Sequence, residues 1–586
     1  MTVIAPLSTP ADLPPLRPAA RWVPIKEPSA AVVRHLMDAL LLPEPVCRLL
    51  ASRGYGEPEA AKRFLRPRLE HLEPADTLHD AERAVARIAD AVRRQETIFV
   101  HGDYDVDGMS STALLTRVLR GLGAQHVVPF VPNRLTDGYD LGPAGVSAAL
   151  AAKATLVVTC DCGTSAVTSV AELTAAGVDV IITDHHLPGS TLPASYAICN
   201  PRHPQCRSSD KDLAAVGVAY KLALALCEAM GVPPALAHRQ LDLVALATIA
   251  DVAPLRGENR VLVRYGLKLL AETTHPGLRA LLRSSGLDAK PLTAGRVGFV
   301  LAPRLNAAGR IADAKLGLKL LLCEREDEAN VVARELEELN RARQELDRHV
   351  LDDAMRQLDA PGMRDRYAHV LHRDGWHAGV IGIVASRIVE QTARPAVLVA
   401  VEQGIGKGSG RSISAFDLHG ALGECRELFV KYGGHRAAAG LTMDAAHLPA
   451  FAERFDQVAR TRLTEADLTP ELRVDLDVPI DDVGEELEKL LKHFEPFGIG
   501  NPAPLFRTAG VRVAAPPRRI GSDGLRVAFD RARGTIDGIG WGLAPRATLF
   551  DPAHPVDVAY RLERDEYRGV SKLQLRVADA RLSGAD

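Results

Sequence analysis

The chain has 586 residues, which at roughly 150 residues per domain predicts about four domains. Hydrophobic residues make up 47% of it and charged residues 25%, a globular composition that excludes wholesale disorder, collagen-like sequence and low-complexity repeats. Its 71 basic and 74 acidic residues give a formal net charge of −3, so a uniformly basic, histone-like binder is excluded and any contact with nucleic acid needs local basic patches.

The first residues and the apolar runs indicate a protein that stays inside the cell. No apolar run reaches the roughly 18 residues of a membrane span, and the start of the chain lacks the pattern of a secretory signal. The 8 cysteines show neither even spacing nor a C-x-x-C pair, which favours reduced thiols in the cytosol. Cys199, His203 and Cys206 give an alternative reading as part of a zinc site, although no fourth ligand is apparent. We expect a soluble cytoplasmic protein with no membrane partner.

The first half of the chain predicts an α/β domain. Residues 1–30 are rich in proline and predict a flexible arm, and residues 31–65 have the apolar spacing of a helical segment that leads into the domain. Three apolar runs, at 97–100, 155–159 and 178–183, are each followed by a polar loop, the first two of them leading into a helical pattern. Repeated strand-to-helix units predict a doubly wound parallel sheet whose ligand site lies at the carboxyl ends of the strands. We assign residues 31–322 to this domain.

The second half predicts three further parts. Residues 323–358 predict one long helix, read as a rigid connector or, alternatively, as a solvated helix packed on a neighbour. Residues 359–460 predict a second, smaller α/β domain. Residues 461–586 contain short alternating segments separated by turns, which predict a small, OB-like β-barrel.

Acidic and imidazole side chains gather at the predicted strand ends. These are His101, Asp105 and Asp107, then Asp161, then Asp184, His185 and His186, and Asp251 after an apolar helix. Each aspartate alone is explained by a helix cap and each histidine alone by a core position, but the whole set is not. Carboxylates with imidazoles suit Mg²⁺ or Mn²⁺, and so many carboxylates at one sheet edge repel each other without cations. The sequence therefore predicts a divalent metal site.

The triplet Asp184-His185-His186, together with the H-x-x-x-D-x-D spacing from His101 to Asp107, resembles the DHH phosphoesterase superfamily. The resemblance implies two ions, with His101 and Asp105 on one, Asp107, His185 and Asp251 on the other, and Asp161 bridging both. It implies catalytic roles for His186, Asp184 and Asp161, with His186 contacting the reacting phosphate and Asp184 orienting its neighbours. Asp103 is an extra acid for which we expect a supporting or merely solvated role. Two ions about 4 Å apart support phosphodiester hydrolysis without a covalent nucleophile.

Longer stretches at 303–310, 376–382 and 496–502 resemble the bacterial single-strand-specific exonucleases of that superfamily. Gly433-Gly434-His435 resembles the substrate-gripping motif of the associated second domain. The glycines of 406–412 either let backbone N–H groups approach an anion or form a tight turn. The candidate substrate contacts are Arg134, Arg304, Asn306, Arg310, His377, Ser409, Arg411, Gly433, Gly434 and His435. Surface salt bridges are the alternative for the arginines of the first domain.

The resemblance implies a Mn²⁺- or Mg²⁺-dependent exonuclease that removes mononucleotides from single-stranded DNA in the 5′-to-3′ direction, in repair and recombination. It implies a single-stranded-DNA-binding protein and a helicase as partners, near the nucleoid. The barrel carries a candidate strand-binding surface, made of Arg518, Arg519, Arg526, Arg561, Arg564, Arg568 and Lys572, with Trp541 or Tyr567 for base stacking. A terminal-phosphate pocket of Ser409, Arg411 and Arg134 is our hypothesis for the polarity. The alternatives are a phosphodiesterase for cyclic dinucleotides or very short RNA, and a non-catalytic strand-binding scaffold.

Overall fold

The computed structural model describes residues 19–134, 136–565 and 571–584. It contains two compact units, which we call the smaller unit (Met1–Val23 and Glu338–Leu472) and the larger unit (Pro24–Glu337 and Arg473–Asp586). Residues 1–18 of the expected arm lie outside the described residues. The end of that arm is ordered instead, because β1 (Arg21–Pro24) pairs with β12 (Glu471–Val474) in a two-stranded sheet.

A five-stranded parallel sheet forms the centre of the first predicted domain. In spatial order its strands are β3 (Val127–Phe130), β2 (Ile98–Gly102), β4 (Leu156–Cys160), β5 (Asp179–Thr183) and β6 (Ala197–Cys199). The chain leaves β2 toward one edge of the sheet and returns on its other side as β4, so a topological switch point lies between these two strands. Ligands bind at the carboxyl edge of such a point.

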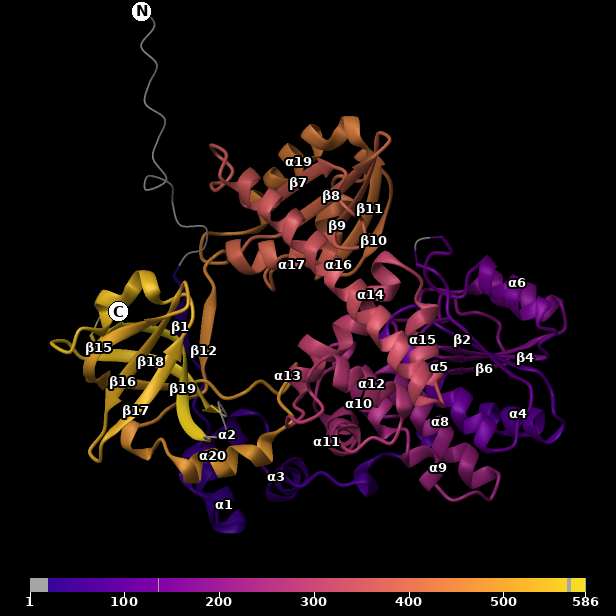
Figure 1. Ribbon diagram of the computed structural model, residues 1–586, viewed down its shortest axis with the longest axis horizontal. Coiled ribbons are helices and arrows are strands. Elements are labelled where there is room, and N and C mark those ends of the chain that lie inside the picture. The colour runs from indigo at the N-terminus through magenta and orange to yellow at the C-terminus, as the bar shows by residue number, and fades with distance from the viewer. Residues whose placement is uncertain (1–18, 135, 566–570, 585–586) are drawn as a thin grey trace, which may run out of the picture. The chain divides into compact units, whose positions relative to one another are not determined.

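Helices cover both faces of this sheet, which is seen between α6 and α4 in Figure 1. One face carries α4 (Ala81–Arg93), α5 (Val106–Gly121) and α8 (Ala215–Ala229). The other carries α6 (Pro143–Ala151) and α7 (Val167–Ala175), whose apolar residues pack on those of the strands. Burial on both faces explains why the strands read as continuous apolar runs. The predicted doubly wound α/β fold is confirmed.

A helical region follows the sheet. Its helices are α9 (Ala235–His238), α10 (Leu241–Ala250), α11 (Gly257–Ala271), α12 (Pro276–Ser284), α13 (Ala294–Arg296), η4 (Val297–Leu301), α14 (Ala302–Ile311) and α15 (Lys315–Leu322). The segment η4 is a π-helix that joins α13 to α14 without a break, and we call residues 294–311 the rod. The long helix expected at 323–358 is α16 (Glu326–Leu358), and the boundary between the two units falls within it.

The C-terminal strands form a seven-stranded, mainly antiparallel sheet. In spatial order they are β13 (Leu476–Asp477), β14 (Phe506–Val511), β18 (Val556–Asp565), β19 (Lys572–Leu582), β17 (Thr535–Gly540), β16 (Gly524–Asp530) and β15 (Val513–Ile520). Phe506 and Phe529 lie on β14 and β16, each one strand from an end of this order, and they belong to one apolar core, so the sheet curls on itself as a barrel does. We call this part of the chain the barrel.

The leading helical segment packs differently from our expectation. It forms α1 (Ala30–Leu40), α2 (Glu44–Ser52) and α3 (Pro58–Leu65). Their apolar side chains, including Leu36 and Phe64, share a core with the barrel, whereas we had assigned them to the first domain. The ring of Phe64 meets that of Phe494 edge-on at 5.4 Å between centroids. Helical periodicity identifies the buried face of such a segment but does not identify its partner.

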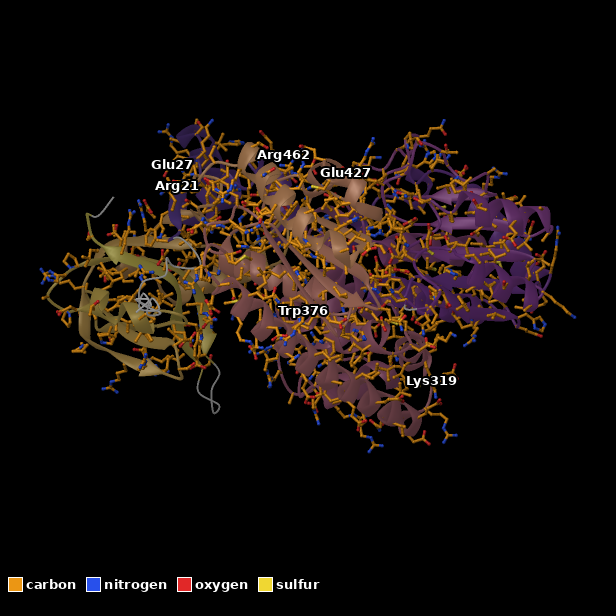
Figure 2. The ribbon with its side chains drawn as sticks, turned by 90° about the horizontal axis from the view of Figure 1, so that it is seen from above. Arg21, Glu27, Lys319, Trp376, Glu427 and Arg462 are labelled. Atoms are coloured by element: carbon orange, nitrogen blue, oxygen red, sulfur yellow. The ribbon has the colours of Figure 1, made fainter. Side chains whose placement is uncertain are left out.

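The smaller unit has a five-stranded mixed sheet, in the order β10 (Phe429–Gly434), β11 (Ala438–Asp444), β9 (Ile405–Arg411), β8 (Ala396–Glu402) and β7 (His369–Asp374). It also contains α17 (Ile381–Thr392), α18 (Leu418–Gly423) and α19 (Leu448–Arg462). The indole N–H of Trp376, labelled in Figure 2, donates to Asp353 of α16 at 3.2 Å. The short helices elsewhere are η2 (Leu69–His71), η3 (Ala75–Thr77), η5 (Arg426–Leu428), η6 (Ala445–His447), η7 (Ile480–Asp482), α20 (Glu485–Leu491), η8 (Lys492–Phe494) and η9 (Ala544–Phe550).

Residues 406–412 do not form a tight turn, which corrects that reading, and their contact with an anion stays a prediction. They lie mostly in the central strand β9, paired on both sides. A Cβ atom at Gly406 or Gly408 would lie 2.8 or 2.7 Å from the side chains of Val399 and Leu441, so these glycines make room for packing. Among the described helices, none is both long enough and apolar enough to cross a bilayer.

Candidate metal centre

The acidic and imidazole residues of the larger unit meet at the switch point of the parallel sheet. Asp105 and Asp107 follow β2, Asp161 follows β4, and His185 follows β5. Asp251 joins them from the C-terminal end of α10. Within the described residues, ligand atoms lie within 4.8 Å of one another in three groups: Asp161, His185 and His186; Asp107, His185 and Asp251; and Asp103, Asp105 and Asp161. Asp161 and His185 each belong to two groups and so connect them.

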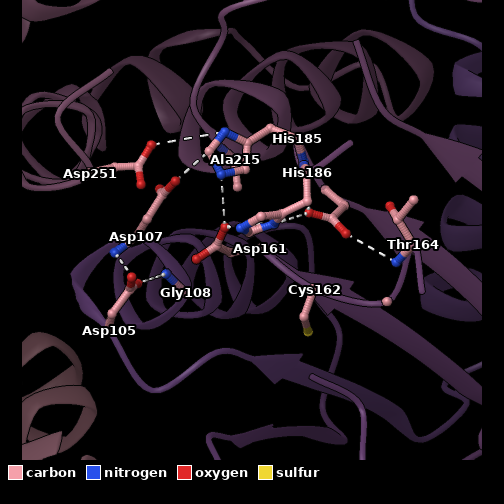
Figure 3. Close-up of polar contacts among 12 residues, drawn as sticks. Asp105, Asp107, Gly108, Asp161, Cys162, Thr164, His185, His186, Ala215 and Asp251 are labelled. Atoms are coloured by element: carbon pink, nitrogen blue, oxygen red, sulfur yellow. Dashed lines mark hydrogen bonds and ion pairs between the residues drawn. The ribbon is translucent and has the colours of Figure 1, made fainter. Parts of the chain in front are cut away.

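Helix N-termini hold the first two carboxylates in place (Figure 3). Asp105 is the N-cap of α5, and its Oδ1 accepts hydrogen bonds from the backbone N–H groups of Asp107 at 2.9 Å and Gly108 at 3.1 Å. The two oxygens of Asp107 accept from the backbone N–H groups of Ala215 and Val216 at the start of α8, both at 2.9 Å. Burial nevertheless raises the pKa of Asp107 to about 7, and the charge of Asp105 adds to this rise.

Asp161 is buried at the centre of the site with an unsatisfied oxygen. Its backbone is left-handed, with φ of 65°, and its N–H donates to the carbonyl of Thr183 at 3.0 Å. Its Oδ1 has no hydrogen-bond partner and lies 3.2 Å from Nε2 of His185, which has none either. Burial, followed by the charges of Asp105 and Asp107, raises the pKa of Asp161 well above its usual value. Two unsatisfied atoms facing the same space are what a metal ion would satisfy.

Asp184 organises the histidine pair. Its Oδ1 accepts from the backbone N–H groups of His185 at 2.7 Å and His186 at 3.1 Å, and it lies 2.8 Å from Nδ1 of His186. Its Oδ2 accepts from the N–H of Thr164 at 3.0 Å. Burial alone would raise the pKa of Asp184, but the bonds to His186 and Thr164 outweigh it and lower the pKa. Burial alone would lower the pKa of His186, but the hydrogen bond to Asp184 and its charge outweigh it and raise the pKa to about 9.

Asp251 and Asp103 complete the acidic cluster. Burial raises the pKa of Asp251 to about 9, with the charges of Asp107 and Asp105 adding to the effect. Asp103 is 3% exposed and its Oδ1 has no partner, which excludes the merely solvated role and leaves the supporting one. The groups combine carboxylates, which repel one another, with imidazoles, and several of their ligand atoms lack a hydrogen-bond partner. Such a set fits a divalent ion such as Mn²⁺ or Mg²⁺.

His101 is placed differently from the other predicted ligands. It is fully buried, its Nδ1 lies 3.5 Å from Sγ of Cys162, and its Nε2 has no partner. A Cβ atom at Gly145 of α6 would lie 2.4 Å from this Nε2, so α6 approaches the ring closely. His101 is in none of the three groups, and its role as a ligand stays a prediction. The alternative zinc residues Cys199, His203 and Cys206 form no such group within the described residues either.

A cavity of about 270 Å³ opens onto the cluster. Three of the candidate substrate contacts line it, namely Arg134, Arg310 and Asn306. Arg304 does not, because its guanidinium donates to Glu337 at 2.6 Å and to the carbonyl of Val300. Arg304 therefore forms a salt bridge, which is the alternative given above for the arginines of the first domain.

The sequence reasoning missed Tyr139, which lines the cavity with its Oη 3.3 Å from Nε2 of His186. Tyr139 lies in the segment after β3 and before α6, and no local pattern in the sequence marks it.

The remaining candidates lie in the smaller unit. The guanidinium of Arg411 donates to Oγ of Ser409 at 3.1 Å, and a Cβ atom at Gly382 would lie 2.8 Å from that Oγ. Nδ1 of His377 accepts from the N–H of Gly379 at 3.0 Å. Gly433, Gly434 and His435 are exposed at the end of β10, and Gly434 has a φ of 138° that only glycine adopts readily.

Three family models match the chain. They are the DHH family N-terminal domain at residues 97–248, the DHHA1 domain at 365–461 and the RecJ OB domain at 474–579. The single-stranded-DNA-specific exonuclease RecJ of Bacillus subtilis is 35% identical over 96% of this chain and 71% of its own length. That of Escherichia coli is 38% identical over 91% of this chain and 95% of its own length.

Solved structures resemble the chain as closely. The crystal structure of RecJ from Thermus thermophilus in complex with Mn²⁺ superposes with a TM-score of 0.83, at 36% identity, over 97% of this chain and 80% of that one. The Mg²⁺ complex from the same organism gives a TM-score of 0.77 at 33% identity, over 97% of this chain and 79% of that one. One of these structures contains Mn²⁺ and the other Mg²⁺, the two kinds of ion that the carboxylates and imidazoles of this site favour.

Proposed function

The chain belongs to the RecJ family of single-stranded-DNA-specific exonucleases, and we propose that it hydrolyses single-stranded DNA at the candidate metal centre. The observation that carries the proposal is the set of buried, unsatisfied ligand atoms at the switch point, above all Oδ1 of Asp161 and Nε2 of His185. Unfilled carboxylates in this arrangement would repel each other, which argues against a scaffold that has lost its ions.

We propose that Mn²⁺ or Mg²⁺ is held by Asp105, Asp107, Asp161, His185 and Asp251, with His101 as a further ligand and Asp103 beside them. When bound, such ions neutralise charge on a phosphodiester and lower the pKa of water, so that hydrolysis needs no covalent nucleophile. The chain's own contribution is orientation and charge. Asp184 fixes the ring of His186, which is 40% exposed, and keeps it protonated beside the cavity, where the cation favours developing negative charge on a phosphate.

Arg134 and Arg310 line the same cavity and supply further positive charge for phosphate groups. In the smaller unit, we propose that Ser409, Arg411, His377 and the Gly433-Gly434-His435 segment bind substrate. The hydrogen bond between Arg411 and Ser409 supports this, because it holds the guanidinium in a fixed direction. A 5′-phosphate bound there gives the 5′-to-3′ release of mononucleotides that we propose.

Membership of the RecJ family is the only support for a cellular process, a location and protein partners. We propose action in DNA repair and recombination near the nucleoid, with a single-stranded-DNA-binding protein and a helicase as partners. The barrel is proposed as a strand-binding domain, following the match to the RecJ OB domain. Of the residues expected on its strand-binding surface, Tyr567 and Arg568 lie outside the described residues.

The test is digestion of end-labelled single and double strands by the purified full chain with Mn²⁺, with Mg²⁺ and with EDTA. We expect single strands to be degraded with either ion, mononucleotides to be released from the 5′ end, and EDTA to stop the reaction. Cleavage restricted to cyclic dinucleotides or very short RNA would overturn the proposal in favour of the small-substrate alternative. Strand binding without cleavage under any metal condition would favour the scaffold.

A further inference from the structure

A buried asparagine beside the metal centre holds the backbone of His186. This residue, Asn200, follows β6 and is fully buried. Its Nδ2 donates to the backbone carbonyl of His186 at 2.9 Å and to Oγ1 of Thr164 at 3.1 Å. Its Oδ1 accepts from the N–H of Arg202 at 2.7 Å, which fixes which end of the amide is the oxygen. Both hydrogens and the oxygen of this side chain are therefore in use.

The parallel sheet places Asn200 beside Asp184. Thr183 of β5 is opposite Cys199 of β6 in the register, so Asp184 and Asn200 are the next residues along two adjacent strands. The N–H of Asp184 donates to the carbonyl of Cys199 at 3.2 Å. The amide thus reaches His186 from the end of a strand, and groups carried by strands are held more precisely than groups carried by loops.

Thr164 connects the same amide to the other side of Asp184. It is 1% exposed, and its N–H donates to Oδ2 of Asp184 at 3.0 Å (Figure 3). A hydrogen bond from the Thr164 side chain also helps to lower the pKa of Asp184. Since Oδ1 of Asp184 meets Nδ1 of His186, these bonds close on themselves. We call the four residues the circuit: Asn200, Thr164, Asp184 and His186.

The turn that carries Thr164 has little freedom. Gly163 has a φ of 106°, and a Cβ atom there would lie 2.8 Å from Oγ1 of Thr159. That Oγ1 donates to the carbonyl of Cys162 at 2.7 Å, and the N–H of Gly163 donates to Oδ1 of Asp140 at 2.7 Å. Thr164 is therefore a fixed point from which the circuit can hold Asp184.

The chain that follows His186 is held by few hydrogen bonds. Residues 187–195 form no helix or strand, and within the described residues no backbone-to-backbone hydrogen bond involves them. Leu187, the next residue, is 60% exposed. The bond from Asn200 to the carbonyl of His186 therefore fixes the backbone at the point where the regular structure ends.

We propose that Asn200 is a positioning residue of the reaction, whose amide acts with the hydroxyl of Thr164 to hold the imidazole of His186 toward the reacting phosphate. The proposal rests on the proposed function and deepens it. Among the described residues that line the cavity or form the groups of candidate ligands, neither Asn200 nor Thr164 appears. Both act through His186, and a displacement of about 1 Å in a reacting group can lower a rate about 100-fold.

The test compares kcat and KM of full-chain variants for nucleotide release from an end-labelled single strand in Mn²⁺. We expect Asn200→Ala to lower kcat about 10- to 100-fold while KM changes less than about threefold. Thr164→Val keeps the shape of the side chain but removes its hydroxyl, so it should lower kcat as well. Thr164→Ser keeps the hydroxyl and should stay within about threefold of the wild-type kcat.

Asn501→Ala is the matched control, because Asn501 is equally buried and also donates to two backbone carbonyls, those of Phe494 and Pro496. It should leave kcat unchanged at a temperature where the protein is folded. The rise in Tm on adding Mn²⁺ to the metal-free protein should be as large in Asn200→Ala as in the wild type, because no candidate ligand is displaced. Loss of that rise would show that Asn200 supports the metal ligands instead, and would overturn the proposal.

A double variant separates positioning from a merely structural role. Asn200→Ala/His186→Ala is expected to lose less than about twofold more kcat than His186→Ala alone, since the amide acts through the imidazole. The same loss with and without His186 would overturn the proposal, as would wild-type kcat in both Asn200→Ala and Thr164→Val. If Asn200→Ala does not fold, Thr164→Val and Thr164→Ser decide the question.

Failure of the proposed function gives a different result. A wild-type chain that releases no nucleotide in Mn²⁺ would refute the proposed function and this proposal with it. An active wild type with equally active variants would refute this proposal alone.

Discussion

Nε2 of His185 lies 3.2 Å from Oδ1 of Asp161, and neither atom makes a hydrogen bond. The pair belongs to both halves of the acidic cluster, since His185 also contacts Asp251 and Asp161 is grouped with Asp103 and Asp105. The proposed metal centre depends on this His185–Asp161 pair, which we call the junction, because it connects the groups of candidate ligands.

Replacing Asp161 by Asn is expected to lower the rate of nucleotide release by at least about 100-fold, because the amide removes one charge from the junction at nearly constant volume. Binding of the single strand in EDTA is expected to persist. The rate is measured with an end-labelled oligonucleotide, with Asp523→Asn, an exposed position on the barrel, as the control. Full activity in Asp161→Asn would contradict the assignment of the site.

Metal binding is expected to stabilise the fold. A ligand present at a hundredfold excess over its Kd contributes about 2.7 kcal/mol to the folded state, so Mn²⁺ should raise the Tm of the metal-free protein by several degrees. Asp251→Asn should respond less to Mn²⁺, yet melt no lower than the wild type in EDTA, because one repelling carboxylate is gone. Differential scanning calorimetry gives both quantities. A Tm that Mn²⁺ leaves unchanged in the wild type counts against a metal centre.

The bond between Asp184 and His186 predicts that the two residues act as a unit. Asp184→Asn removes the charge that keeps the His186 ring protonated and oriented, so a loss of kcat of about 10- to 100-fold is expected. His186→Ala should lower kcat by at least the same factor. The double variant should lose little more than His186→Ala alone, since the two share one interaction. Multiplicative losses in the double-mutant cycle would show that Asp184 acts independently of His186.

Asn501 is expected to matter for stability. Asn501→Ala removes two donors to backbone carbonyls and leaves the guanidinium of Arg53, which donates to Oδ1 at 2.6 Å, without this acceptor. Loss of buried hydrogen bonds of this kind costs about 1–3 kcal/mol. Urea unfolding measures the change, with the partly exposed Asn330→Ala on α16 as control. A difference in unfolding free energy below about 0.5 kcal/mol between the two variants would show that the hydrogen bonds of Asn501 contribute little to stability.

His369 predicts a dependence of stability on pH. Burial, followed by the charge of Arg394, lowers the pKa of His369 to about 3, so the folded state favours the neutral ring. Between about pH 6.5 and 3 the unfolded chain binds the extra proton, and the stability present above pH 6.5 is lost as the pH falls, at up to about 1.4 kcal/mol per pH unit.

His369→Leu is expected to flatten this dependence, because an apolar side chain replaces a ring whose Nδ1 has no partner. The free energy of unfolding of the full chain is measured by denaturant titration followed by circular dichroism at pH 7, 6 and 5. His447→Leu, at an exposed position of the same unit, is the control. Parallel curves for wild type and His369→Leu would remove His369 as the cause.

The gathering of Asp105, Asp161 and His185 at one edge could be predicted because parallel strands place their carboxyl ends together, and each residue closely follows an apolar run. Burial of Asp103 could not be predicted, since an acid in a polar loop reads equally well as solvated. Tyr139 was missed because it lies nine residues beyond the end of β3, a distance over which local patterns do not fix direction.

Long-range partners were likewise outside the reach of local patterns. Gly406 and Gly408 fitted a tight turn because glycine weakens strands, whereas here they make room for side chains of neighbouring strands. Arg564 and Lys572 read as free cations because their acidic partners are far away in the sequence or on another strand. The apolar face of α1–α3 was evident, but its partner lies roughly 400 residues further along the chain.

That separation has a consequence for synthesis. Leu36 and Phe64 share one core with Phe506 and Phe529, so the core that buries α1–α3 is incomplete until the barrel strands have left the ribosome. At about 5–20 residues per second, roughly 400 residues take about 20–80 s to translate. Throughout that interval the nascent helices expose their apolar faces, which makes them binding sites for holding chaperones and makes prematurely terminated chains prone to aggregate.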